Sequence, residues 1–417
     1  METRLADWIK DTPDGREADA ILRSCVHCGF CTATCPTYQL LGDELDGPRG
    51  RIYQIKQVLE GAEATRSTQL HLDRCLTCLG CETTCPSGVR YGRLLEIGRH
   101  VVDARVARPL PERAARAALR AGLSRPALFG MALRLGRALR PFLPAALRAK
   151  LLGARAAGRT PQRGQARRVL LLTSCTQEAL LPSIDRATAR VLAALGVEAR
   201  AEPRAGCCGA VRAHLGDPEG GLVAARRNVD AWSAHLDAGV EALVMTASGC
   251  GIRVKDYGRM LAGDPVYAER ARRVSERTVD LAEWLAGELE GLRPLAGTPK
   301  AGRVAFHAPC TLQHGQRIRG RAEAILAALG AELAPVRDGH LCCGSAGAYS
   351  LLEPGLSTAL RERKLAGLTA GSPAMILSAN VGCLAHLAAG TEIPVRHWIE
   401  WVDELIEARR ADDGIAG

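Results

Sequence analysis

The sequence predicts a multidomain α+β protein, in which a small helical domain rich in cysteine is followed by two repeated α/β units. Three observations support this fold class. A cysteine run occurs twice within the first ninety residues, a basic segment follows it, and the rest of the chain repeats its own order of strands, helices and cysteines. The 417 residues give enough length for about two to four domains with buried cores.

The two cysteine runs share the pattern C-x2-C-x2-C-x3-C-P. They extend from Cys25 to Pro36 and from Cys75 to Pro86. This spacing holds [4Fe-4S] clusters in two-cluster ferredoxins, where the fourth cysteine of each run binds the other cluster. Structural zinc uses cysteine pairs that are well separated, so the runs indicate iron–sulfur clusters rather than zinc. By this rule the ligands of one cluster are Cys25, Cys28, Cys31 and Cys85, and those of the other are Cys75, Cys78, Cys81 and Cys35.

Helical patterns surround both runs. Residues 1–24 lead into the first run as a predicted helix, and residues 51–60 and 94–106 carry apolar side chains at helical spacing. Small ferredoxins join their runs through strands, whereas this helix-rich spacer is similar to the helical ferredoxins of respiratory complexes. Residues 1–106 are therefore predicted to form a helical ferredoxin-like domain with two [4Fe-4S] clusters.

Residues 107–168 are predicted to form a basic linker rich in Pro, Arg and Ala. Residues 99–168 carry 17 Lys/Arg and two Asp/Glu, so this segment accounts for the net charge of +10 on the whole chain. Within it, residues 126–140 have the pattern of an amphipathic helix. Such a helix docks on an anionic membrane surface or a partner, or it connects two domains and packs its apolar face inward, and the sequence leaves both alternatives open. The apolar face holds Leu128, Met131, Ala132, Leu135 and Leu139, and the basic face holds Arg134, Arg137 and Arg140 with Leu133 among them.

The C-terminal part of the chain consists of two repeats, residues 169–300 and 301–417. Each contains a strand pattern leading to a cysteine, a helix, a Cys-Cys-Gly sequence, a second helix, and a strand leading to a fourth cysteine. Strands that alternate with helices predict α/β units with parallel strands, which place ligands at their carboxyl ends. The cysteines are Cys175, Cys207, Cys208 and Cys250 in the first repeat, and Cys310, Cys342, Cys343 and Cys383 in the second.

Each repeat is predicted to bind a metal centre through its four thiols. Adjacent cysteines do not form an unstrained disulfide, and the glycine after each pair, Gly209 or Gly344, permits a loop that turns both thiols toward one point. Four thiolates suit a structural zinc or an iron–sulfur cluster. We favour iron–sulfur, because the first domain supplies two clusters that need an electron partner, and zinc is the alternative.

Composition and missing motifs exclude several other functions. The N-terminus lacks the apolar segment of a signal peptide and no apolar stretch reaches the roughly 18 residues of a membrane span, so we expect the reducing cytoplasm, where thiols stay free. Aromatic residues make up 4% of the chain, which argues against stacking on nucleic-acid bases. No phosphate loop or dinucleotide fingerprint is present, and no catalytic constellation is readable. The chain is therefore expected to carry single electrons from a partner that performs the substrate chemistry.

Longer segments carry a family resemblance, which extends over nearly the whole chain. They are residues 18–53, 71–75, 206–209, 246–250 and 340–347. These segments resemble the iron–sulfur subunits of bacterial glycolate oxidase (glycolate dehydrogenase). The resemblance implies a cytoplasmic complex in which subunits of the FAD type oxidise glycolate to glyoxylate, while this subunit passes electrons toward membrane quinone. It also allows peripheral contact with the inner face of the cytoplasmic membrane.

The repeats resemble the family's CCG domains, which are similar to those of heterodisulfide reductase. In that enzyme the pattern ends in C-x-x-C, and five thiols bind a noncubane cluster. Here the fifth position is Arg253 in the first repeat and His386 in the second, which argues against a noncubane cluster and disulfide-reducing catalysis. The favoured interpretation is an electron-transfer subunit without catalytic residues of its own. The alternatives are the same role for glycerol 3-phosphate or lactate, and a catalytic subunit like that of heterodisulfide reductase.

Overall fold

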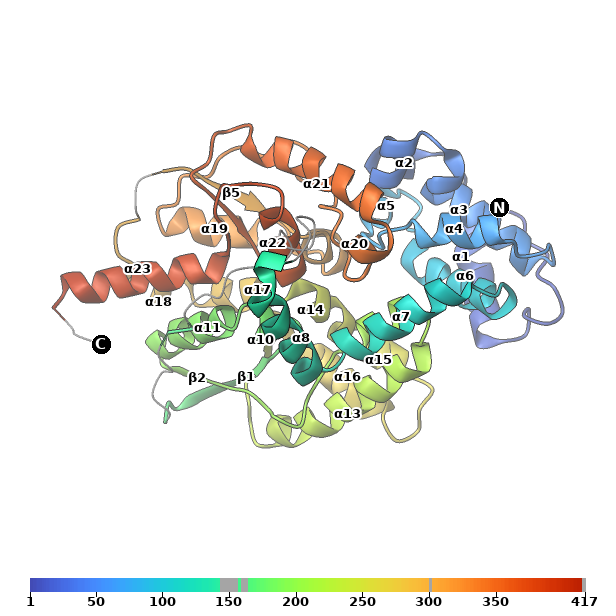
Figure 1. Ribbon diagram of the computed structural model, residues 1–417. Coiled ribbons are helices and arrows are strands. Elements are labelled where there is room, and N and C mark those ends of the chain that lie inside the picture. Colours follow the sequence, from blue (N-terminus) through green and yellow to red (C-terminus); the bar gives the residue numbers. More distant parts are fainter. Residues whose placement is uncertain (143–156, 159–163, 300–301, 415–417) are drawn as a thin grey trace. The chain divides into compact units, whose positions relative to one another are not determined.

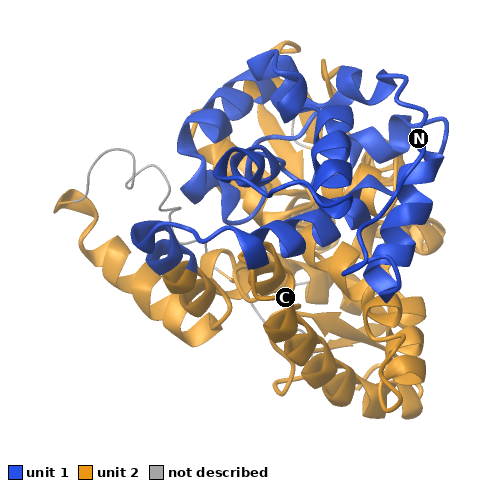
Figure 2. Ribbon diagram, turned by 90° about the vertical axis from the view of Figure 1, so that its right-hand side faces the viewer, with its two compact units in different colours: residues 1–116, 340–364 blue, residues 117–339, 365–417 orange. Residues whose placement is uncertain are grey.

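The computed structural model describes the chain except residues 143–156, 159–163, 300–301 and 415–417 (Figure 1). The chain divides into two compact units (Figure 2). Unit 1 consists of residues 1–116 and 340–364, and unit 2 consists of residues 117–339 and 365–417. These units group the chain by packing, and the four domains expected from the sequence stay a prediction.

Unit 1 is built from helices and has no strand among its described residues. The predicted helical character is confirmed, but the first twelve residues do not form a helix: residues 1–6 are irregular and residues 7–11 form turns. Helix α1 starts at Pro13 because the Thr12 side chain accepts a hydrogen bond from the Gly15 N–H and proline fits the first turn. The elements are α1 (Pro13–Ser24), η1 (Phe30–Thr34), α2 (Pro36–Leu41), η2 (Glu44–Asp46), α3 (Pro48–Leu59), α4 (Arg66–Asp73), α5 (Gly80–Thr84), α6 (Tyr91–Arg105) and α20 (Tyr349–Leu352), with the starts of α7 (Leu110–Leu123) and α21 (Pro354–Thr369).

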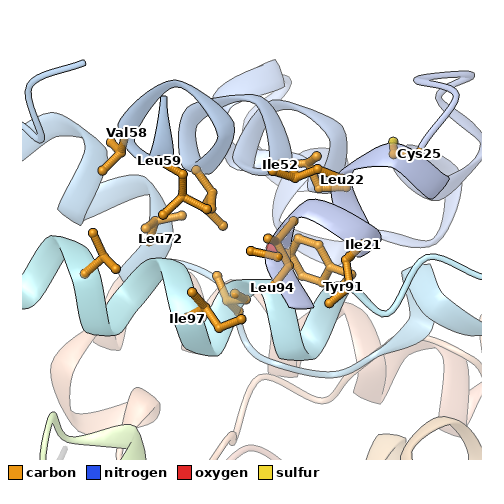
Figure 3. Close-up of a cluster of buried hydrophobic side chains, with 14 of the residues drawn as sticks. Ile21, Leu22, Cys25, Ile52, Val58, Leu59, Leu72, Tyr91, Leu94 and Ile97 are labelled. Carbon is orange, nitrogen blue, oxygen red and sulfur yellow. The ribbon is translucent and has the colours of Figure 1, made fainter. Parts of the chain in front are cut away.

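An apolar core connects these helices with the cysteine runs (Figure 3). Leu22 of α1, Ile55 of α3 and Leu94 of α6 have no exposed surface. Cys25, the first cysteine of its run, belongs to the same buried cluster. Gly98 allows α6 to approach α3, since a Cβ at this position would lie 2.6 Å from Cγ1 of Ile55. The core therefore holds the start of the first run against the helices.

Two parallel sheets organise unit 2. Their strand orders are β2-β1-β3-β4 and β5-β6-β7. Leu170 pairs with Leu243 in the first sheet and Val304 with Met375 in the second. The predicted parallel α/β units are confirmed, and the structure adds β4 and β7 to the strands read from the sequence. The bounds are β1 (Arg167–Leu172), β2 (Val197–Arg200), β3 (Leu243–Met245), β4 (Thr278–Asp280), β5 (Val304–His307), β6 (Met375–Ser378) and β7 (Val395–His397).

Helices surround both sheets, so the central strands are buried on both faces, as parallel sheets require. Leu170, Leu172 and Leu243 are at most 1% exposed. The helices are α8 (Pro126–Ala138), α10 (Gln177–Leu180), α11 (Ser183–Ala194), α12 (Ala210–His214), α13 (Pro218–Asp237), α14 (Ser248–Lys255), α15 (Tyr257–Met260), α16 (Ala268–Arg277), α17 (Leu281–Gly287), α18 (Leu289–Leu292), α19 (Arg321–Ala328), α22 (Val381–Ala388) and α23 (Trp398–Asp412), with the short turns η3 (Arg140–Phe142), η4 (Arg293–Leu295) and η5 (Thr311–Gly315).

Helix α8 is amphipathic, as the sequence pattern predicts, and its apolar face is exposed to solvent. Met131 and Leu135 are 60% and 61% exposed, whereas Leu133, on the other face, is 7% exposed. The helix contacts α10, and Nη2 of Arg137 donates a hydrogen bond to the carbonyl of Leu180 at 3.3 Å. In the described part of the chain the apolar face is therefore not packed inward. None of the helices among these residues is long and apolar enough to cross a membrane.

The two repeats pack against each other within unit 2. Helix α23 of the second repeat lies on α11 of the first, where Arg190 forms an ion pair with Asp403 at 2.6 Å. Ser183 donates a hydrogen bond to Glu400 at 2.6 Å in the same contact. Both pairs join residues more than two hundred positions apart, so this contact fixes one repeat on the other.

Candidate iron–sulfur and metal sites

Both cysteine runs fold into the same turn. His27 and Gly29 in the first run, and Thr77 and Leu79 in the second, have φ between 52° and 89°. These are equivalent positions, two and four residues after the first cysteine. A left-handed conformation costs a residue other than glycine roughly 1–2 kcal/mol, and it is a particular strain for β-branched threonine. Such turns persist where other interactions compensate, and bound iron–sulfur clusters would provide them.

The structure brings five of the predicted ligands around one hollow of unit 1. Cys25, Cys28, Cys31, Cys85 and Cys81 line about 430 Å³ of empty space, part of it open to solvent. We call these first four residues the upstream set. The set combines three cysteines of the first run with the last of the second, which is the combination expected for crossed ligation.

The other four predicted ligands, the downstream set, also approach each other. Burial raises the pKa of Cys81 well above its usual value, and the nearby thiols of Cys78, Cys75 and Cys35 raise it further. The charge of Cys35 also contributes to raising the pKa of Cys31, which lies four residues before it. Four sulfur donors, two of them buried and two partly exposed, suit an iron–sulfur cluster, so the residues present fit this group. Because Cys81 also lines the hollow of the upstream set, crossed ligation stays a proposal.

Charged residues surround Cys75 of the downstream set. Burial acts to raise the pKa of Cys75, but the charges of Arg51 and Arg99 together with hydrogen bonds from Tyr91 and Thr77 outweigh burial, and the pKa is lowered. The hydroxyl of Tyr91 and the backbone N–H of Thr77 each donate to Sγ of Cys75 at 3.5 Å. Hydrogen bonds to the sulfurs and nearby charge are two of the factors by which a protein changes the potential of an iron–sulfur cluster. The sequence analysis missed Arg51, Arg99 and Tyr91, because nothing in the cysteine pattern points to them.

The first repeat gathers its four cysteines at the carboxyl ends of its strands. Cys175 follows β1, Cys207 and Cys208 precede α12, and Cys250 lies in the first turn of α14 after β3. Their thiols form a series of hydrogen bonds from Cys175 through Cys207 and Cys208 to Cys250. The pKa of Cys207 is lowered because Cys175 and then Cys208 donate to its thiolate, while the same bonds raise the pKa of both donors. Four thiols this close can bind one metal centre.

A buried asparagine holds the cysteine pair of the first repeat in place. Asn228 of α13 has no exposed surface, and its Oδ1 accepts a hydrogen bond from the Gly206 N–H at 2.9 Å. Its Nδ2 donates to the carbonyl of Cys207 and to the hydroxyl of Tyr257, both at 3.1 Å. Tyr257 in turn donates to the carbonyl of Cys208 at 2.9 Å. Neither residue has a recognisable spacing from the cysteines, so sequence reasoning did not find them.

The glycine after this cysteine pair is required by its surroundings. Gly209 has φ of 87°, and a Cβ there would lie 2.6 Å from the carbonyl oxygen of Gly221. Gly344 has φ of 89° at the equivalent position of the second repeat, and its carbonyl accepts a hydrogen bond from Ser357 at 2.8 Å. Both loops therefore have the conformation that the Cys-Cys-Gly sequence predicts.

The cysteines of the second repeat belong to different units. Cys310 follows β5 and Cys383 lies in α22 after β6, both in unit 2, whereas the buried pair Cys342 and Cys343 lies in unit 1. Their assembly into one metal site stays a prediction. His386, at the position of the fifth thiol, is 8% exposed.

The last cysteines of the two repeats lie close to each other in unit 2. Asn380 accepts a hydrogen bond from the Gly249 N–H at 3.2 Å and donates to Sγ of Cys383 at 3.5 Å. Ser248 and Thr311, which neighbour Gly249 and Cys310, have their hydroxyl oxygens 2.7 Å apart. The strand ends of both repeats therefore face one another, as α/β folds with a shared ligand region do.

Two family matches agree with this arrangement. Residues 21–89 match the 4Fe-4S dicluster domain family, and residues 169–255 and 304–388 match the Cysteine-rich domain family (CCG). The chain is thus an iron–sulfur protein that combines a dicluster domain with two cysteine-rich domains.

Comparison with whole proteins identifies the family. The chain is 54% identical over 409 residues to the glycolate oxidase iron-sulfur subunit of Escherichia coli (strain K12), covering 98% of this chain and 100% of that protein. It is 29% identical to the probable glycolate oxidase iron-sulfur subunit of Bacillus subtilis (strain 168), covering 89% of each. Lactate utilization protein A of Exiguobacterium sp. is 25% identical over 57% of this chain and 98% of its own length. The chain belongs to the family of glycolate oxidase iron–sulfur subunits, as its motifs predicted.

Proposed function

We propose that this chain is the electron-transfer subunit of a glycolate-oxidising complex. The observation that carries the proposal is the 54% identity to the E. coli glycolate oxidase iron-sulfur subunit over the full length of that relative. The lactate utilization relatives are more distant and cover little more than half of this chain, so lactate is a weaker candidate. Arg253 and His386 replace a fifth thiol in the two repeats, which argues against disulfide reduction.

The proposed role divides the work between this chain and flavin-containing partner subunits. The clusters supply one-electron transfer, which suits the step after a flavin has taken two electrons from the substrate. The upstream and downstream sets would hold one [4Fe-4S] cluster each through crossed ligands. Cys35 and Cys81 of the downstream set are buried, and Asn228 holds the cysteine pair of the first repeat. Electrons would leave toward membrane quinone.

We also propose that α8 makes a peripheral contact with the membrane from the cytoplasmic side. Its exposed apolar face, which includes Met131 and Leu135, continues into Phe142, which is 85% exposed. Arg134 and Arg140 are exposed beside this face. An outward apolar stripe flanked by arginines is complementary to an anionic lipid surface, where the acyl chains accept the stripe and the headgroups attract the charges.

The function is tested by adding glycolate to the anaerobically purified, cluster-loaded chain and following its visible absorbance. We expect no bleaching from the chain alone and rapid bleaching once the flavin-containing subunits are added. D-lactate and glycerol 3-phosphate serve as comparison substrates with the same subunits. Bleaching by glycolate without a flavoprotein would contradict the proposed division of work. Faster bleaching by another substrate would contradict glycolate as the substrate of the complex.

A further inference from the structure

A fully buried arginine lies beside the downstream set of cysteines. Arg51 of α3 has no exposed surface, and its Nε donates to the carbonyl of His71 at 2.7 Å. Its Nη1 donates to Oγ1 of Thr37 at 3.2 Å, and this oxygen lies 3.3 Å from Sγ of Cys35. The guanidinium group therefore reaches one downstream ligand through a single hydroxyl.

The charge of Arg51 is not cancelled by its carboxylate partner. Nη2 of Arg51 lies 3.2 Å from Oδ1 of Asp46, but Oδ2 of the same carboxylate pairs with Arg74 at 2.9 Å. Two arginines thus share one carboxylate, so Asp46 alone does not neutralise Arg51. Arg74 is 28% exposed and also interacts with the charge of Glu353. A charge in a buried, low-dielectric environment such as that of Arg51 acts more strongly and is less screened by salt than a charge at the surface.

A second arginine acts on the other end of the downstream set. Nη2 of Arg99 donates to the carbonyl of Cys75 at 2.8 Å and to that of Leu72 at 2.7 Å. Tyr91 adds the hydroxyl hydrogen bond to Sγ of Cys75 described above. Both ends of this set, Cys35 and Cys75, therefore face groups that stabilise negative charge on sulfur.

The upstream set has a different environment. Cys28 is exposed, and its neighbours Val26 and Phe30 are 67% and 63% exposed. The cation near this set is Arg49, which is partly exposed and pairs with Glu44 at 2.8 Å. Its charge is therefore largely neutralised and screened by water.

We propose that Arg51 makes the cluster held by the downstream set the more easily reduced of the two. The inference rests on the crossed ligand sets proposed above. When one electron passes from the upstream to the downstream cluster, the first is oxidised, the second is reduced, and no bond forms or breaks. Arg51 stabilises the negative charge that the downstream cluster gains. Among the described residues, no comparable buried cation lies near the upstream set. Electrons from a reduced flavin partner that enter at the upstream set, where Cys28 is exposed, would therefore move to the downstream cluster.

The test is a redox titration of the full, cluster-loaded chain, followed by EPR. The two signals are assigned beforehand with Cys85→Ser for the upstream cluster and Cys81→Ser for the downstream one. In the unmodified chain we expect the downstream signal to be reduced first. Reduction of the upstream signal first would overturn the proposal, whatever the Arg51 variants do.

Arg51→Gln removes the charge and Arg51→Lys retains it. We expect Arg51→Gln to lower the reduction equilibrium constant of the downstream cluster at least tenfold, which is about 59 mV for one electron, and Arg51→Lys to lower it much less. The matched control is Arg108→Gln, because Arg108 is a mostly buried arginine of the same unit that pairs with Asp73 and Asp103. This control should leave both potentials unchanged.

The remaining outcomes separate this inference from the proposed ligand sets. Unchanged potentials in Arg51→Gln would overturn the role of Arg51 and leave crossed ligation standing. An equal fall for both clusters would mean that Cys35 serves the upstream cluster, and this would overturn crossed ligation together with the inference. If the Arg51→Gln chain fails to bind clusters, the order in which the two clusters of the unmodified chain are reduced still tests the proposal.

Discussion

Replacing Asn228 by alanine should loosen the cysteine pair of the first repeat and release its metal. The change removes three hydrogen bonds of 3.1 Å or shorter, which join Asn228 to Gly206, Cys207 and Tyr257, in a place without exposed surface. It also removes a weaker one of 3.4 Å from Nδ2 to the Gly206 carbonyl. Each such bond contributes about 1 kcal/mol net, and alanine regains roughly 0.5 kcal/mol as the better helix former. The expected loss in the free energy of unfolding is therefore about 2–3 kcal/mol.

Thermal unfolding and metal analysis measure this loss. A loss of 2–3 kcal/mol should lower the Tm of the transition that includes unit 2 by about 5–10 °C, because each kcal/mol shifts Tm by roughly 2–4 °C in a domain of this size. The iron or zinc bound by the first repeat should fall, while the dicluster signals persist. The matched control is Ser233→Ala on the same helix, which removes the bond to the Val229 carbonyl and a longer, partly exposed bond from Nε of Arg270 at 3.3 Å, and the Tm should change by less than about 2 °C. An Asn228→Ala chain with unchanged Tm and metal content would refute the reasoning.

Three further outcomes are expected. Cys85→Ser should perturb the EPR signal of the cluster on Cys25, Cys28 and Cys31 because the fourth ligands cross, and a change confined to the other signal would contradict crossed ligation. Arg134→Gln with Arg140→Gln should reduce sedimentation of the chain with anionic vesicles, as should added salt, whereas salt-insensitive binding or an unaffected double variant would contradict docking of α8 on lipid. Cys208→Ala or Cys343→Ala should leave the reduction of flavin by glycolate intact in the assembled complex and slow transfer to a quinone analogue. Elemental analysis of the same variants then distinguishes iron from zinc, and unslowed transfer would exclude both cysteines from the electron path.

The sequence by itself determined the features that depend on local spacing. The C-x2-C-x2-C-x3-C-P runs fix the turns, because few conformations place three thiols on one side of so short a segment. The helix from 51 to 60 and the strands at 169 and 304 follow from apolar periodicity, which the structure confirms in α3, β1 and β5. The Cys-Cys-Gly sequences likewise specify the left-handed glycine at 209 and 344.

Tertiary structure decided what depends on residues far apart in the chain. Neither Asn228, twenty residues beyond the cysteine pair, nor Arg51 belongs to a motif, and each acquires its role only when helices α13 and α3 are packed. The orientation of α8 is a similar case. Its pattern defines an apolar face, but whether Met131 points inward or outward depends on which face finds a partner, and Leu133 packs inward instead. The spacing of apolar residues shows which face of a helix is apolar and which is polar. Only the packing of neighbouring elements determines which of the two faces is buried.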